Sequence, residues 1–172
     1  GGAGLGKTHL LKAIKQYIEE QDPEKKVIYV STEQFTNQVI ETLRLGGASD
    51  MIKLREKYRT ADVLLIDDIQ FLIGKEATQQ HFFHTYNDLH AEGRQIVITS
   101  DRPPKELSTL NERYISRCEW GLMCNIDAPD FQTRMDILRK QTELLRVKVD
   151  EDILGYIANN FTANIRELEG AL

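Results

Sequence analysis

Residues 1–10 of the chain read GGAGLGKTHL, and this stretch decides how the rest of the sequence is interpreted. It has the form Gly-x-x-x-x-Gly-Lys-Thr, in which glycines let backbone N–H groups turn toward a phosphate without a Cβ in the way. An amphipathic helical pattern follows at once, and the positive N-terminal end of a helix favours an anion. Lys7 supplies a mobile cation for the phosphates and Thr8 a hydroxyl for Mg²⁺. The stretch therefore predicts a phosphate-binding loop.

Size and composition indicate one α/β domain, or one with a small appendage. The chain has 172 residues, 41% of them hydrophobic, and a formal net charge of −5. That charge argues against a domain that coats duplex DNA by bulk electrostatics. Cys118 and Cys124 lack metal-ligand spacing, and reduced thiols are expected. No run approaches the roughly 18 apolar residues of a membrane span and no signal-peptide pattern is seen, so a cytoplasmic protein is expected.

Periodicity predicts strands that alternate with helices, an arrangement typical of a parallel sheet covered on both faces. Strands are expected at residues 26–31, 62–71, 94–101 and 121–127. Helices are expected at 8–20, 32–43, 49–60, 77–93 and 111–120, the second with a capping box from Ser31 and Gln34. Helical patterns alone follow Pro129. We therefore expect an α/β subdomain over residues 1–128 and a small helical lid over residues 129–172.

A second motif follows a buried strand, in VLLIDD at residues 63–68. Asp67 is expected to hold Mg²⁺ through water, and Asp68 to orient or deprotonate an attacking water. The alternative is that the paired acids only cap a strand end in solvent. The next strand ends in TSD, where Asp101 or Thr99 is a candidate for sensing a γ-phosphate; a plain turn before Pro103 is the alternative.

Six stretches together resemble the AAA+ domain of the DnaA family of bacterial replication initiators, and the resemblance runs from residue 1 to residue 172. They are GGAGLGKTHLLKAI, VLLIDDIQFL, HFFHTYNDLH, IVITSDRPPKEL, SRCEWGL and NIRELEGAL. The resemblance implies a P-loop fold whose first strand lies upstream of Gly1 and a duplex-DNA-binding domain that follows Leu172. It also implies ATP or ADP with Mg²⁺ as ligands.

The family's residue roles can be assigned to matching positions. The resemblance implies a nucleotide-binding set of Gly1, Gly2, Gly4, Gly6, Lys7, Thr8, His9 and, as sensor 2 from the lid, Arg166. It implies a catalytic set of Lys7, Asp67, Asp68, Asp101 as sensor 1 and Arg117 as the arginine finger. Mg²⁺ would be bound by Thr8 and, through water, by Asp67.

Two arginines, Arg113 and Arg117, are implied to act between subunits; a solvated helix face is the alternative for this pair. For Arg166 the alternative is a set of lid salt bridges with Glu167 and Glu169. The residue after the finger departs from the family, which usually has an aromatic where this chain has Cys118. A smaller residue there would support Arg117 less well.

Single-stranded DNA contacts are implied at Ile40, Lys75, Ala77 and Thr78. Ala77 departs from family members that carry an arginine. A role in the core or in lid packing is the alternative for Ile40. Because Lys75 alone is a weak phosphate contact, such contacts would have to add up along an oligomer.

The function expected from this resemblance is that of an ATP-switched initiator domain. ATP-bound copies would assemble into a helical oligomer on origin DNA, bind one strand and unwind the duplex, and slow hydrolysis would end the assembly. The replicative helicase, regulators and acidic phospholipids are implied partners, in the nucleoid-associated cytoplasm. A related AAA+ helicase loader or initiator-regulating ATPase is one alternative, and a small-molecule P-loop kinase is another.

Overall fold

The computed structural model describes residues 1–46, 48–107 and 121–172, and these form two compact units. One unit comprises Thr8–Met123, and the other combines Gly1–Lys7 with Cys124–Leu172. The helix expected at 111–120, with Arg113, Arg117 and Cys118, lies outside the described residues. The two predicted subdomains, 1–128 and 129–172, remain a prediction.

A parallel three-stranded sheet organises the unit Thr8–Met123. The strands are β1 (Val27–Ser31), β2 (Val63–Asp67) and β3 (Gln95–Ile98), in the order β1-β2-β3. Ser31 pairs with Asp67 across β1 and β2, and Ile66 pairs with Ile98 across β2 and β3. All five residues of the central strand are buried, as its apolar sequence predicts for a sheet covered on both faces.

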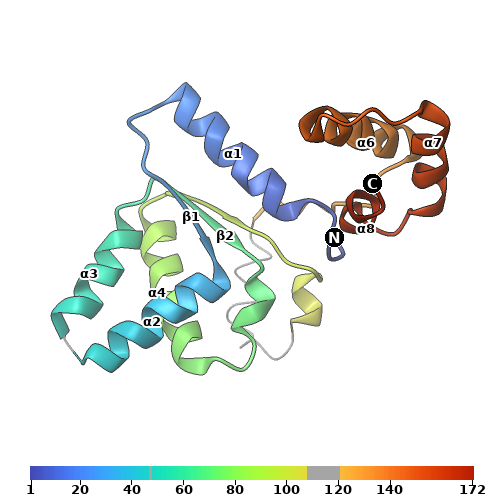
Figure 1. Cartoon of the computed structure of the whole chain (residues 1–172). Helices are drawn as coiled ribbons and strands as arrows, with labels where there is room; N and C mark the ends of the chain where they lie inside the picture. The colour runs from blue at the N-terminus through green and yellow to red at the C-terminus, as the bar shows by residue number, and fades with distance from the viewer. Residues whose placement is uncertain (47, 108–120) are drawn as a thin grey trace. The chain divides into compact units, whose positions relative to one another are not determined.

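Helices cover both faces of this sheet, as the alternation of strands and helices predicts. Val63 and Leu65 of β2 pack with Leu11 of α1 (Lys7–Gln21). Leu64 and Ile66 face the other way, into a core built with α2 (Thr32–Leu45), α3 (Ala48–Arg59) and α4 (Glu76–Ala91). Figure 1 shows α1 on one side of the strands and α2, α3 and α4 on the other. The predicted fold class is confirmed.

Local signals in the sequence set the ends of α2. The Ser31 hydroxyl accepts a hydrogen bond from Gln34 N, and the Gln34 side chain accepts one from Ser31 N, which is the predicted capping box. The helix ends at Gly46, whose φ of 70° is a left-handed conformation that glycine adopts readily. These caps position the helix that follows β1 directly.

The strand predicted at residues 121–127 is wrong. The structure has no strand there, and Leu122 is 94% exposed. A strand requires a hydrogen-bonded neighbour, and no described segment pairs with these residues. The strand predicted at 62–71 is also shorter than expected, because the chain turns at Asp68 into the 3₁₀ helix η1 (Ile69–Leu72). A second 3₁₀ helix, η2 (Pro104–Glu106), follows β3.

The second unit is a small helical bundle that includes the Gly-rich loop. Its helices are α6 (Phe131–Leu145), α7 (Glu151–Asn160) and α8 (Ile165–Gly170). Their shared core contains Met135, Leu138, Leu154, Ile157, Ala158 and Leu168. Arg134 ties this unit together, since its guanidinium donates to the backbone oxygens of Ala158 at 2.8 Å and Pro129 at 2.6 Å. The N-terminus lies beside α8 (Figure 1). None of the helices in the described part of the chain is long and apolar enough to cross a membrane.

Candidate nucleotide-binding site

The Gly-rich loop packs directly against the start of α8, within the same unit. Ile165 N donates to Gly4 O at 2.9 Å. Gly4 has a φ of +72°, and a Cβ there would lie 3.0 Å from Asn164 Oδ1. A Cβ on Gly1 would lie 2.1 Å from Ile126 O, too close for any side chain. Glycine is therefore required at Gly4 by its backbone conformation and its close neighbours, and at Gly1 by its close neighbours. This is expected of a loop that presents N–H groups to an anion.

Lys7 is the cation of this loop. Its side chain is buried, with 7% exposure, and Nζ donates to Gly1 O at 3.0 Å and to Gly2 O at 2.5 Å. The ammonium is thus held against the backbone of the loop that it follows. A positive group at this place suits a ligand that carries several negative phosphate oxygens.

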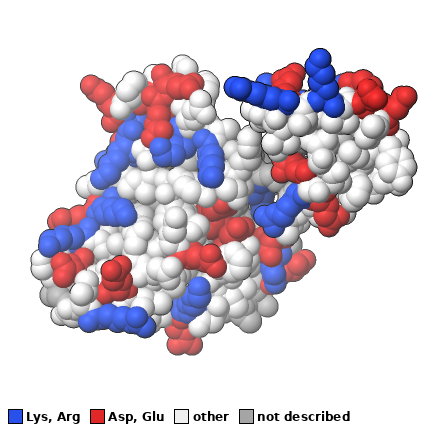
Figure 2. Space-filling model, viewed as in Figure 1, with Lys and Arg blue, Asp and Glu red and all other residues white. Residues whose placement is uncertain are grey.

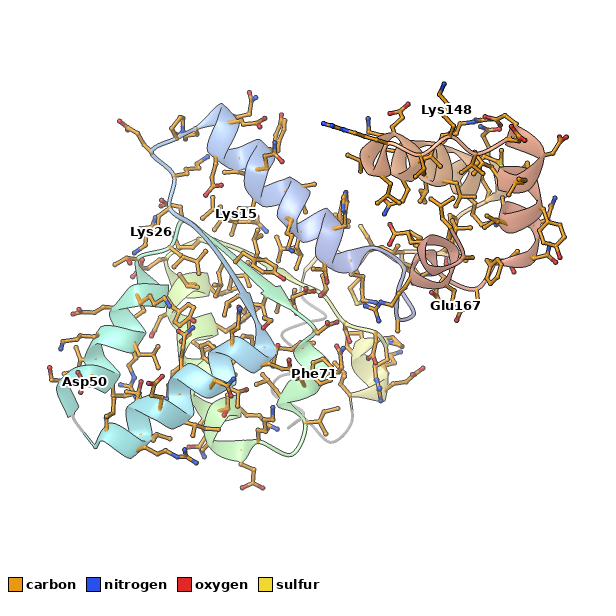
Figure 3. The ribbon with its side chains drawn as sticks, in the orientation of Figure 1. Lys15, Lys26, Asp50, Phe71, Lys148 and Glu167 are labelled. Atoms are coloured by element: carbon orange, nitrogen blue, oxygen red, sulfur yellow. The ribbon has the colours of Figure 1, made fainter. Side chains whose placement is uncertain are left out.

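Arg166, the predicted sensor 2 residue, lies on α8 and is exposed. Asn164 caps this helix, since its Oδ1 accepts from Glu167 N at 2.8 Å while its Nδ2 donates to Glu167 Oε1 at 2.9 Å. Glu167 is labelled in Figure 3, on α8. The same Asn164 lies against Gly4, so the helix that bears Arg166 is fixed to the phosphate loop through its cap.

Asp67 ends β2 as a buried carboxylate surrounded by hydroxyl groups. It is 3% exposed. Its Oδ2 accepts from Thr8 Oγ1 at 2.6 Å and from Tyr29 OH at 3.0 Å, and its Oδ1 accepts from Thr99 Oγ1 at 2.6 Å. Carboxylate and hydroxyl oxygens are the ligands that Mg²⁺ prefers, so this donor set fits the ion implied by the sequence. The structure brings Thr8 and Asp67 together as the two motifs predict.

Asp68 occupies an unusual backbone conformation beside Asp67. Its φ and ψ are both 58°, in the left-handed region that Asp tolerates better than most residues. Its N–H donates to Thr99 Oγ1 at 3.0 Å, and its Oδ1 accepts from Gln70 Nε2 at 3.0 Å. The turn after β2 thus presents the second acid at the carboxyl edge of the sheet, where ligands bind in open α/β folds.

The two candidates at the end of β3 differ in what they contact. Thr99 bonds both acids, as described above. The Asp101 carboxylate accepts two hydrogen bonds from the side chain of its neighbour Arg102, at 2.8 and 3.0 Å. The backbone N–H of Asp101 donates to Gln70 Oε1 at 3.3 Å. Gln70 therefore links Asp101 to Asp68 through one side chain. The sensor 1 role of Asp101 remains a prediction.

Three residues that contact predicted site residues were missed from the sequence: Tyr29 and Gln70 in the unit Thr8–Met123, and Asn164 in the other unit. Burial raises the pKa of the Tyr29 hydroxyl to about 12, and its hydrogen bond to Asp67 raises it as well. A tyrosine within the apolar run VIYV was a usable signal, because a buried hydroxyl needs a partner. Gln70 and Asn164 carried no such signal, since amides are common in turns and helix caps.

The predicted single-strand contacts lie on two helices or next to one, and they differ in exposure. Ile40, on α2, is 40% exposed, whereas Thr78, on α4, is 3% exposed and does not present its hydroxyl to the surface. Lys75 immediately precedes α4, and Ala77 in its first turn is exposed. Figure 2 shows Lys and Arg interspersed with Asp and Glu over the visible described surface, without one broad basic area.

A parallel sheet with a phosphate loop and a strand-end Asp defines the class of P-loop nucleotide-binding proteins. The model of the bacterial DnaA ATPase domain family matches residues 1–125. The chain therefore belongs to that family, and the AAA+ fold expected from the sequence is confirmed.

Relatives agree along the whole chain. The chromosomal replication initiator protein DnaA of Lachnoclostridium phytofermentans is 56% identical over 172 residues, which are 100% of this chain and 38% of that protein. The crystal structure of domain III of the Thermotoga maritima replication initiation protein DnaA matches with a TM-score of 0.92 at 43% identity, covering 99% of this chain and 70% of that one. Replication initiator DnaA bound to AMPPCP and single-stranded DNA matches with a TM-score of 0.84 at 36% identity, covering 99% of this chain and 51% of that one.

Proposed function

We propose that this chain binds ATP with Mg²⁺ and hydrolyses it slowly, as the switch of a replication initiator. One observation carries the proposal: Thr8, which follows the loop lysine, donates to Asp67 at the end of the buried strand, with 2.6 Å between the two oxygens. This contact joins the two halves that phosphate-loop ATPases need. The related initiator bound to AMPPCP, a nucleotide analogue, supports it.

Each residue has a physical role in this proposal. The glycines and Lys7 bind the phosphates, and Thr8 and Asp67 hold Mg²⁺, the latter through water. When bound, Mg²⁺ neutralises phosphate charge and orients the nucleotide. Asp68, held by Gln70, accepts the proton of the attacking water. Arg166 reads the γ-phosphate from α8, because a planar guanidinium can bond two phosphate oxygens at once.

Assembly and DNA binding form the second half of the proposal. Arg117 of one copy completes the ATP site of the next copy, and Arg113 also acts between subunits. The resulting helical oligomer binds one strand of origin DNA. Support comes from the related initiator bound to AMPPCP and single-stranded DNA. We further propose that the whole protein works in the nucleoid-associated cytoplasm with the replicative helicase, regulators and acidic phospholipids, and binds duplex DNA through a further domain.

A DNA-binding titration tests this function. The complete protein is titrated against a fluorescent poly-dT oligonucleotide with ATP, ADP or no nucleotide, at several protein concentrations and with Mg²⁺ present. Cooperative binding with ATP alone is expected, and Lys7→Ala should abolish it, because its ammonium no longer binds the phosphates. Equal binding in all three nucleotide states would overturn the initiator function and favour a loader or regulator that acts on a protein partner.

A further inference from the structure

The register of the sheet brings a tyrosine to the Asp67 carboxylate. Tyr29 pairs with Leu65, and Ser31 pairs with Asp67, so Tyr29 and Asp67 belong to the set of side chains on one face. This is the face covered by α1, where Tyr29 packs with Val63, Leu65 and Leu11. Thr8 lies in the first turn of α1, on the same face. A tyrosine side chain is long enough to reach from its position opposite Leu65 to Asp67, two residues further along β2.

The tyrosine hydroxyl is one of three donors to a buried charge. Tyr29 OH donates to Asp67 Oδ2 at 3.0 Å, on the oxygen that also accepts from Thr8, while Thr99 donates to Oδ1. Among the described residues of this unit, the hydrogen-bond partners of the carboxylate are hydroxyls and not cations. A carboxylate with 3% exposure depends on such bonds to keep its orientation, because a buried polar group needs hydrogen-bond partners.

Thr8 and Thr99 each have a second task. Thr8 is the proposed Mg²⁺ ligand, and the Thr99 hydroxyl also accepts from Asp68 N at 3.0 Å. Within the described chain, the only side-chain hydrogen bond of Tyr29 is the one to Asp67, and no metal or phosphate role is proposed for its hydroxyl. Its ring is fixed by apolar neighbours, so its hydroxyl points to a defined place.

We propose that Tyr29 is a positioning residue of the nucleotide site, which fixes the Asp67 carboxylate in the orientation that binds hydrated Mg²⁺. It touches neither nucleotide nor metal and acts only through Asp67. The inference rests on the proposed ATP site and adds a residue to it. Because the hydroxyl already holds the carboxylate in place before the ion binds, Mg²⁺ binding does not include the free-energy cost of ordering that carboxylate.

The test compares Tyr29→Phe with Tyr58→Phe in the complete protein. Both changes remove one hydroxyl from a tyrosine of the same unit, partly buried at Tyr29 and buried at Tyr58, and the Tyr58 hydroxyl donates to Gln38 at 2.8 Å, away from Asp67. Affinity for a fluorescent ATP analogue is followed by anisotropy, first in EDTA and then over rising Mg²⁺ concentration. The Mg²⁺ concentration at half of the affinity gain should rise about 10- to 100-fold in Tyr29→Phe, the range that corresponds to the loss of one hydrogen bond to a charged group. Affinity in EDTA should not change, and Tyr58→Phe should follow the parent.

Two results of this titration would overturn the positioning role. One is a Tyr29→Phe Mg²⁺ curve that superimposes on the parent, and the other is an equal loss of affinity in EDTA and in Mg²⁺, which would mean a general loss of structure. A parent protein that binds no nucleotide would overturn the proposed function instead. In that case the crystal structure of Tyr29→Phe tests the positioning role without any nucleotide. If the Asp67 carboxylate in that structure keeps its orientation and its contact with Thr99, the positioning role is overturned.

Discussion

Asp67 and Asp68 are adjacent acids with different surroundings. Asp67 is buried among hydroxyls and ends the strand, whereas Asp68 is only partly buried and turns away in a left-handed conformation, with Gln70 on its carboxylate. The two neighbouring carboxylates can therefore have different roles, with Asp67 proposed to hold the metal ion and Asp68 proposed to accept a proton. The division comes from the backbone turn, since the two side chains are chemically the same.

Asp68→Asn should separate proton transfer from binding. Asn fits the same left-handed backbone and can keep the bond from Gln70, but it cannot accept a proton from water. We expect kcat for ATP hydrolysis to fall about 10²- to 10⁴-fold, the usual contribution of a general base, with ATP affinity unchanged. Steady-state hydrolysis and ATP titration measure both.

A matched control for this change is Asp50→Asn. Asp50 lies on α3 and forms an exposed ion pair with Lys53 at 3.2 Å, and such pairs contribute little. The control should hydrolyse ATP like the parent. An Asp68→Asn protein that also does so would show that another group takes the proton.

Gly4→Ala and Gly74→Ala form a matched pair that tests the loop. Both glycines have positive φ, +72° and +76°, but a Cβ on Gly4 meets Asn164 whereas one on Gly74 meets nothing within 4 Å. Each variant should lose about 1–2 kcal/mol of stability from the left-handed backbone. Only Gly4→Ala should also lose ATP affinity, because the cap of α8 and the loop are displaced. Urea denaturation and ATP titration measure the two effects, and a similar affinity loss in Gly74→Ala would contradict this account.

Among the elements, α2 shows how a short local signal fixes a helix. The capping box of Ser31 and Gln34 was readable from four residues, and it starts the helix at the residue after β1. Thr32, the first residue of α2, donates its hydroxyl to Asp67 O at 2.9 Å. The beginning of this helix is therefore tied to the end of the central strand.

Ser31→Ala should destabilise the protein by about 1 kcal/mol, the usual effect of losing an N-cap oxygen. The reason is that Gln34 N loses its acceptor at the exposed start of α2. Ser31→Asn keeps an acceptor of similar reach and should recover most of the loss. Urea denaturation compares the three proteins, and equal destabilisation by Ala and Asn would argue that Ser31 acts through something other than its cap.

The sequence predicted those elements that depend on neighbours along the chain. The described helices, the buried strand β2 and the contact between Thr8 and Asp67 follow from periodicity and motif spacing. The strand expected at 121–127 failed because strand formation depends on a distant partner, which an apolar run does not specify. The contact between Tyr29 and Asp67 was missed for the same reason, since it depends on the register between β1 and β2.

At the scale of the whole molecule, the proposed activity depends on contacts between copies of the protein. The chain spans 38% of its relative from Lachnoclostridium phytofermentans, so assembly and DNA binding are matters for the complete protein. The net charge of −5 of this 172-residue chain makes strong binding of one copy of it to DNA unfavourable. ATP-dependent assembly is a way to add many weak strand contacts.

Arg117→Ala should bind ATP like the parent but fail to assemble. A guanidinium that bonds a phosphate of the neighbouring copy supplies about 1.5–3 kcal/mol, so the protein concentration for half assembly should rise about 10- to 100-fold. Analytical ultracentrifugation with ATP and with ADP measures it. Lys148→Ala, an exposed charge of the helical unit labelled in Figure 3, is the control. Assembly of Arg117→Ala at the parent's concentration would show that this arginine does not act between subunits.

The packing of the Gly-rich loop on α8 has a consequence for synthesis on the ribosome. Gly4 and Ile165, which share a backbone hydrogen bond, are separated by roughly 160 residues of chain. At about 5–20 residues per second, translation needs about 10–30 seconds to pass from one to the other. During that interval the loop has been made but lacks the helix that supports it. A nascent chain therefore acquires the complete phosphate loop late, after the sheet has been translated.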